Sequence, residues 1–137
     1  MNFKTVKKFT AEVGWGYLAT SDGKKVGVRP MGSCVWMDKE LWCATSTGTE
    51  KILHLKKVPY AEYCFMDEKG RHVRIAGPCK ISTNNGDKLK LYEAVPALKK
   101  YYKNPSAPEY VVIRMKPKRI LFMTKTGKGY EDIALPK

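Results

Sequence analysis

Apolar and polar residues along this chain follow two rhythms, one helical and one typical of strands. Near the N-terminus, apolar side chains recur at three- and four-residue spacing over residues 3–13, which predicts a short amphipathic helix with lysines on its polar side. From Gly16 onward, short apolar runs are separated by turn residues such as Ser21-Asp22-Gly23, as in antiparallel strands. The predicted strands cover residues 16–20, 25–37, 41–45, 60–66, 71–82 and 110–124, the last being a strand pair or one bent strand across Lys116-Pro117-Lys118.

Two further segments have helical spacing. Residues 47–58 begin with Thr47-Gly48-Thr49-Glu50, which matches a capping box in which Thr47 caps the helix and Glu50 reaches back to its backbone N–H. Apolar residues from Leu89 to Leu98 predict another helix, disturbed by Pro96. The tail from Gly127 is expected to be a loop.

The strands follow one another without crossover helices, so we expect them to be antiparallel. No linker or internal repeat interrupts residues 1–137, which predicts a single domain. The predicted fold is mainly β with peripheral helices: a six-stranded, Greek-key-like antiparallel barrel.

The net charge of +13 indicates a protein that attracts phosphate groups. The positive charge is densest in residues 99–128, where nine Lys or Arg residues face only Glu109. Charge alone does not distinguish nucleic acid, an anionic membrane or a small cofactor. No apolar run approaches the ~20 residues of a membrane span, and the first residues lack an apolar signal core, so we expect a cytoplasmic location and no membrane partner.

The cysteines and histidines carry no metal-binding pattern. The four cysteines, Cys34, Cys43, Cys64 and Cys79, each lie in a strand-like run without C-x-x-C spacing, and we expect them to be buried and reduced. His54 lies among lysines and is expected to be exposed. With only two isolated histidines, we predict no metal site.

A candidate anion site lies between residues 45 and 51. There a strand ends, hydroxyl residues and Gly48 follow, and a helix begins with Lys51 in its first turn. Free backbone N–H groups and the positive end of the helix dipole attract anions at such a point. The alternative is that Thr47 and Glu50 only cap the helix, and both interpretations stand at this stage.

Two further stretches contain candidate ligand contacts. Pro30 has no N–H, so the strand that carries Arg29-Pro30-Met31-Gly32 is expected to bend or bulge and free backbone groups for a ligand, unless it is only a barrel corner. His72 and Arg74 share one face of the 71–82 strand, for which a solvated outer face is the simpler interpretation.

Taken in order, these segments resemble the pyridoxamine 5′-phosphate oxidase-like family of FMN-binding split-barrel proteins. The resemblance covers about residues 10–82. The matching pieces are residues 16–23, 27–31, 41–45, 49–51 and 73–77.

The resemblance implies a homodimer with FMN bound at the subunit interface. Arg29, Pro30, Met31 and the following Gly32 would lie along the isoalloxazine and ribityl chain. The composition of the tail, and not the resemblance, suggests that Tyr130 of the partner covers the ring. The ribityl and phosphate would be held by Thr45, Ser46, Thr49 and Lys51, with Glu50 between them, and His72 would touch the flavin.

The implied function is that of an FMN-dependent oxidoreductase with an unassigned small-molecule substrate, in the short branch that includes nitroimidazole-reductase-like and general-stress flavoproteins. Pyridoxamine phosphate oxidation is disfavoured, because the oxidase has Arg where Glu50 stands and has a longer C-terminal substrate-binding segment. One alternative is a nucleic-acid-binding barrel, suggested by the charge and by Tyr101, Tyr102 and Tyr110, which lie beside lysines and are expected to be exposed. Others are the same barrel holding haem or a deazaflavin, and a flavin store or sensor without turnover.

Overall fold

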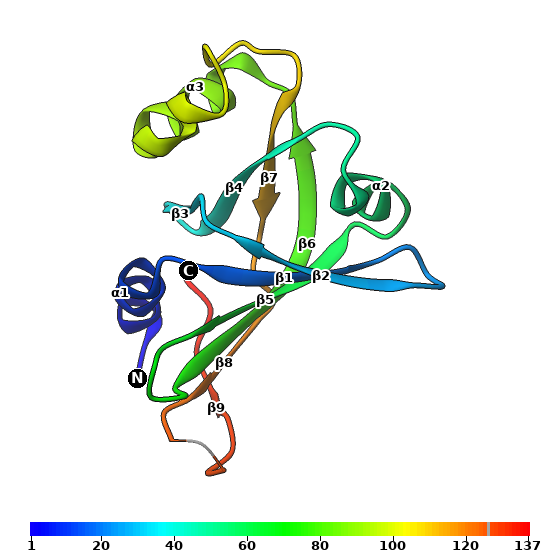
Figure 1. The fold of residues 1–137 in the computed structure, drawn as a ribbon. Helices are drawn as coiled ribbons and strands as arrows, with labels where there is room; N and C mark the ends of the chain where they lie inside the picture. Colours follow the sequence, from blue (N-terminus) through cyan, green and yellow to red (C-terminus); the bar gives the residue numbers. More distant parts are fainter. Residues whose placement is uncertain (126) are drawn as a thin grey trace.

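The computed structural model describes residues 1–125 and 127–137, and its main feature is one curled antiparallel sheet (Figure 1). Every strand pairing in the described residues is antiparallel, which confirms the mainly-β prediction. The strands are β1 (Gly16–Ser21), β2 (Val26–Met31), β3 (Cys34–Met37), β4 (Glu40–Ser46), β5 (Tyr60–Met66), β6 (His72–Ser82), β7 (Tyr110–Met115), β8 (Arg119–Met123) and β9 (Glu131–Asp132).

The sheet is curled into a barrel that is split between β2 and β3. The order along the sheet is β2-β1-β5-β6-β7-β4-β3, so β2 and β3 stand at opposite ends of the path. Only Gly32 and Ser33 connect them, and so short a link brings the two ends together only if the sheet curls. The predicted strand over 25–37 is therefore two strands, broken where Pro30 and Gly32 suggested a bend.

The long strand β6 joins the two halves. Its residues Cys79–Ser82 pair with β7, whereas His72–Ala76 pair with β8. β7 and β8 are thus successive parts of one bent strand, interrupted at residues 116–118, and not a strand pair. The expectation of a loop after Gly127 is wrong in part, because β9 pairs with β8.

Within residues 1–125 and 127–137, three α-helices and one 3-10 helix pack around the sheet. They are α1 (Phe3–Val13), α2 (Glu50–Lys57), α3 (Asn85–Ala94) and the 3-10 turn Pro96–Lys100. α1 has the predicted bounds. α3 begins before Leu89, because Asn84 accepts the Asp87 N–H and caps it, and Leu91 instead of Leu89 is buried.

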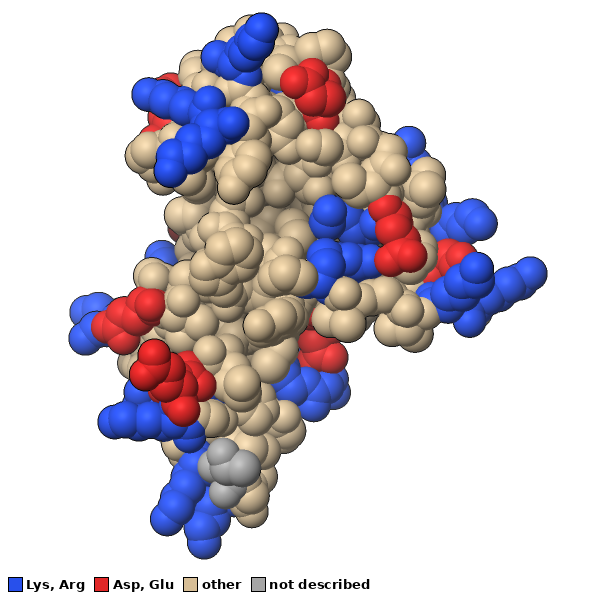
Figure 2. Space-filling view, in the orientation of Figure 1, with Lys and Arg blue, Asp and Glu red and all other residues tan. Residues whose placement is uncertain are grey.

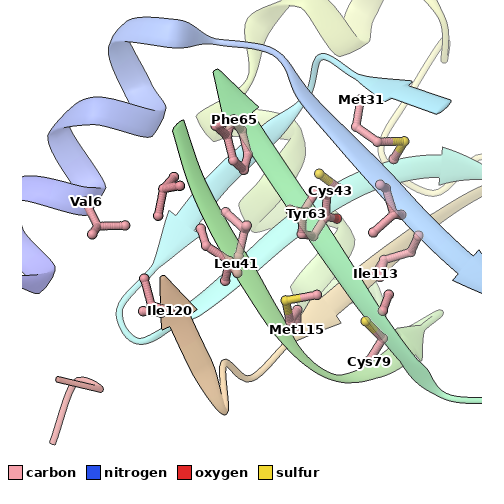
Figure 3. Close-up of a cluster of buried hydrophobic side chains, with 14 of the residues drawn as sticks. Val6, Met31, Leu41, Cys43, Tyr63, Phe65, Cys79, Ile113, Met115 and Ile120 are labelled. Atoms are coloured by element: carbon pink, nitrogen blue, oxygen red, sulfur yellow. The ribbon is translucent and has the colours of Figure 1, made fainter. Parts of the chain in front are cut away.

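Two apolar clusters hold these elements together. The larger fills the barrel with side chains such as Tyr63, Phe65 and Ile113 (Figure 3). The smaller lies under α3 and includes Leu91, Leu98 and Tyr110. Burying one such side chain contributes about 1.5–3 kcal/mol. The second cluster therefore holds α3 and the 3-10 turn against β4, next to the split.

The prediction that all four cysteines are reduced is wrong for two of them. Cys34 and Cys43 form a disulfide. They are direct partners in the β3–β4 register, with Cα atoms 4.3 Å apart, and an interpretation of each cysteine in isolation misses this pairing. Cys64 and Cys79 are free.

Candidate functional site

A cavity of about 390 Å³ opens at the split of the barrel. Figure 2 shows the hollow, with Lys and Arg side chains gathered on the side toward α2. The β2–β3 connection, the end of β4, the start of α2 and the segment after α3 line it. The lining residues are Trp15, Pro30, Met31, Gly32, Ser33, Ala44, Thr45, Ser46, Thr49, Lys51, Ala97, Leu98, Tyr101 and Tyr102.

The structure brings most of the predicted site residues together here. Seven of the ten line this one cavity: Pro30, Met31, Gly32, Thr45, Ser46, Thr49 and Lys51. They come from β2 and the connection that follows it, from the end of β4, and from the N-cap and first turn of α2, and the curling of the sheet places them side by side.

Lys51 supplies positive charge to the cavity. Its Nζ donates to Thr45 Oγ1 at 2.9 Å, and within the described residues it makes no ion pair with a carboxylate. Burial, and secondly the charge of Arg29, lower the pKa of Lys51. An ammonium group that is partly desolvated and lacks a counter-charge is stabilised when an anion binds beside it.

The start of α2 differs from the predicted capping box. Gly48, with φ of +80°, turns the chain, and the helix begins only at Glu50, with Thr49 as its N-cap. Thr49 makes no side-chain cap and donates its hydroxyl to Ser46 O at 3.0 Å. Thr47 lies outside the helix, where its N–H donates to Glu109 O. The first-turn N–H groups are therefore left without this side-chain cap.

Glu50 pairs with Arg29 instead of closing a capping box. Arg29 Nη2 donates to Glu50 Oε1 at 2.6 Å, and neither residue lines the cavity. A Cβ on Gly27 would meet Glu50 Oε1 and come within 2.5 Å of Arg29 Nη2, so the missing side chain at Gly27 leaves the space for this ion pair.

The aromatic side of the cavity comes from residues that sequence reasoning missed. Trp15 and Tyr101 are 59% and 74% exposed, and Trp15 packs over Gly32. Tyr102 is buried, with its hydroxyl 2.6 Å from Ser46 Oγ, and it stacks on buried Tyr110. The expectation that all three tyrosines are exposed is therefore wrong for Tyr102 and Tyr110.

His72 lies away from this cavity. Its Nε2 is 2.8 Å from the Tyr130 hydroxyl, and both residues line another hollow of about 300 Å³ with Tyr17 and Arg74. Arg74 forms a two-pronged ion pair with Glu62. Within one chain, His72 is therefore not brought to the Lys51 site.

The described residues contain no group of three or more His, Cys, Asp or Glu placed to hold a metal ion. None of the helices described is long and apolar enough to cross a membrane.

Comparison with known proteins adds family information. A family model described as "Pyridoxamine 5′-phosphate oxidase" matches residues 3–124. The comparison with curated proteins found no match.

Solved structures of similar fold cover nearly the whole chain. A NimC/NimA family protein from Clostridium acetobutylicum is 24% identical, with a TM-score of 0.85 over 98% of this chain and 92% of that one. The general stress protein 26 from Bacillus anthracis is 20% identical, with a TM-score of 0.73 over 93% and 98%. A protein described as a 5-nitroimidazole antibiotic resistance protein, from Bacteroides thetaiotaomicron, is 11% identical, with a TM-score of 0.72 over 87% and 81%. At these identities the similarity establishes the split-barrel fold.

Proposed function

The chain belongs to the pyridoxamine 5′-phosphate oxidase family, a split-barrel family that generally binds FMN, and on that basis we propose that it is a flavoprotein that holds FMN at the split of its barrel. The observation that carries the proposal is Lys51: a partly buried ammonium group, without a carboxylate partner in the described residues, facing a cavity of suitable size.

The polar end of the cavity suits the phosphate. Lys51, the Thr45, Ser46 and Thr49 hydroxyls and the first-turn N–H groups of α2 would hold it. Arg29 does not line the cavity, but its guanidinium pairs with Glu50, the first residue of α2 and the neighbour of Lys51 in sequence. We therefore assign Arg29 to the phosphate end instead of the ring, with which the sequence interpretation had associated it.

The other end of the cavity suits a flat aromatic ring. The β2–β3 connection offers the backbone of Gly32 and the side chains of Pro30 and Met31, while Ala44 and Leu98 provide apolar surface. Trp15 and Tyr101 stand exposed at the same cavity. A ligand with a charged tail and an apolar ring therefore matches the distribution of residues.

When bound, FMN supplies hydride or single-electron transfer. The chain's own residues bind and orient the cofactor, and no acid or base is assigned to them. We propose a cytoplasmic oxidoreductase with an unassigned small-molecule substrate. Pyridoxamine phosphate oxidation stays disfavoured, because Glu50 stands where the oxidase has Arg.

We also propose that the protein works as a homodimer. β1, β2 and β5 carry exposed apolar side chains on one face, since Tyr17 pairs with Pro30 and Ala19 with Val28 in the register. Val28 is 67% exposed, which is typical of an interaction surface. Pro30 belongs both to this face and to the cavity, so a second copy on the face would lie beside the flavin. His72 and Tyr130 also lie on this face and would then meet the partner.

The test is the visible spectrum of the protein after purification and after incubation with FMN, with mass identification of any released molecule. We expect a flavin spectrum and release of FMN. A haem spectrum or a deazaflavin mass would assign the cavity to those cofactors instead. A colourless protein that does not take up FMN would show that the proposal is wrong. The nucleic-acid alternative is weakened, because two of its three stacking tyrosines are buried.

A further inference from the structure

His54 is buried although it lies among lysines, contrary to the expectation that it is exposed. It is 5% exposed and sits on α2, which packs against β1. Its Nδ1 lies 2.8 Å from the hydroxyl of Thr20, a β1 residue that is itself buried. A buried hydrogen bond therefore joins α2 to β1.

The Thr20 hydroxyl also contacts Arg29. Arg29 Nη1 donates to Thr20 Oγ1 at 2.6 Å and, at longer range, to the carbonyls of Leu18 and Gly27. A guanidinium only donates, so Thr20 accepts from Arg29 and its own proton is free for His54. The Thr20 hydroxyl also hydrogen-bonds His54 Nδ1, so the three residues form one hydrogen-bonded chain from Arg29 through Thr20 to His54.

We propose that Thr20 and His54 are positioning residues that hold the Arg29 guanidinium at the first turn of α2, which carries Glu50 and Lys51, and so add its charge to the phosphate site. This rests on the proposed FMN function. Neither residue lines the cavity, and both act only through Arg29.

Two side chains hold the Arg29 guanidinium, Thr20 at Nη1 and Glu50 at Nη2. Glu50, whose side chain is 64% exposed, holds the other side of the guanidinium. Without the Thr20 hydroxyl, Arg29 Nη1 keeps its longer contacts to the Leu18 and Gly27 carbonyls but loses the shortest of its three contacts. The Thr20 hydroxyl therefore limits how far the guanidinium moves with the Glu50 side chain.

Matched substitutions test the proposal. Thr20→Val removes the hydroxyl at nearly constant shape, whereas Thr20→Ser retains it. His54→Leu keeps the helix and the apolar bulk, whereas His54→Asn keeps an acceptor near the Nδ1 position. Affinity for FMN is measured by fluorescence quenching, with circular dichroism to verify folding.

We expect Thr20→Val and His54→Leu to weaken FMN binding about 5- to 30-fold, on the scale of one charge-assisted hydrogen bond, and the Ser and Asn variants to stay within about 3-fold of the wild type. In an Arg29→Ala background, Thr20→Val should have no further effect, because its target is gone.

Equal FMN affinity of Thr20→Val, His54→Leu and the wild type would overturn the positioning role alone. So would an undiminished effect of Thr20→Val in the Arg29→Ala background. If the wild type binds no FMN at all, the proposed function is wrong and the positioning role is wrong with it.

Discussion

The Lys51 ammonium lies 2.9 Å from the Thr45 hydroxyl and so ties the first turn of α2 to the end of β4. The contact holds the positive charge at the wall of the cavity, because both residues line it. The lysine has neither full hydration nor a counter-charge among the described residues, so an anion bound beside it would stabilise its positive charge.

Removing the Lys51 charge should weaken FMN binding. Lys51→Ala is expected to cost about 1–3 kcal/mol, which corresponds to about 5- to 150-fold in Kd, since a charge-assisted hydrogen bond is lost. Lys56→Ala, an exposed lysine of the same helix, is the control and should bind FMN like the wild type. Equal affinity of the two variants in a fluorescence titration would remove Lys51 from the site.

The affinity for FMN should fall at a lower pH than it would for a lysine with an unshifted pKa. Burial and Arg29 lower the pKa of Lys51 below its usual 10.5, and the amine binds phosphate only when protonated. Affinity therefore decreases as pH rises through this lowered pKa.

The same shift has the opposite effect on stability. Between the lowered pKa and 10.5 the unfolded chain binds more protons, so the contribution of Lys51 to the free energy of unfolding rises with pH. The Kd for FMN, measured against pH for the wild type and for Lys51→Ala, separates the titration of Lys51 from that of other groups. An equal loss of FMN affinity at alkaline pH in both proteins would contradict the assignment of Lys51 to the site.

The Glu50 carboxylate should oppose the phosphate. Glu50→Gln is expected to tighten FMN binding roughly 2- to 5-fold at low salt, because an exposed charge contributes only a fraction of a kcal/mol. The gain should shrink at 0.5 M salt through screening. Glu12→Gln, an exposed change on α1, serves as the control. Weaker binding by Glu50→Gln would mean that Glu50 itself supports the cofactor.

A charge on the exposed sheet face should break the proposed dimer. The wild type is expected to have twice the 15.6 kDa mass of the chain in light scattering, and Val28→Glu to shift toward 15.6 kDa, because a buried unpaired carboxylate is unfavourable. Leu89→Glu, exposed on α3, should stay dimeric. A monomeric wild type would rule out the dimer.

The contiguous parts of the site could be predicted from the sequence. A strand end, a hydroxyl-rich turn and a helix start follow one another from Thr45 to Lys51, and local patterns describe such segments well. The bounds of β5 and β6 were predicted almost to the residue, because turn residues separate the two strands and such turns are local features of the sequence.

The parts that depend on tertiary contacts could not be predicted. Tyr102 reaches Ser46 across 56 residues, and only the packing of the segment after α3 brings them together. The prediction of a capping box at Thr47 was wrong, because the Glu50 side chain pairs with Arg29 of a distant strand instead of reaching back to Thr47. His54 was expected to be exposed because its neighbours are lysines, whereas its own side of α2 packs on β1.

Thiol counting should find two free cysteines in the protein that has not been reduced. Alkylation in denaturant is expected to modify Cys64 and Cys79 only, and all four cysteines after reduction, since Cys34 and Cys43 are bonded across adjacent strands. The disulfide closes a loop with a sequence separation of nine, which lowers the entropy of the unfolded chain and stabilises the folded state by about 2–3 kcal/mol. Urea unfolding should therefore show Cys34→Ser and Cys43→Ser less stable than the oxidised wild type by that amount. Cys64→Ser, the control, leaves the disulfide in place and should not show this loss. Four alkylated cysteines without reduction would contradict the disulfide.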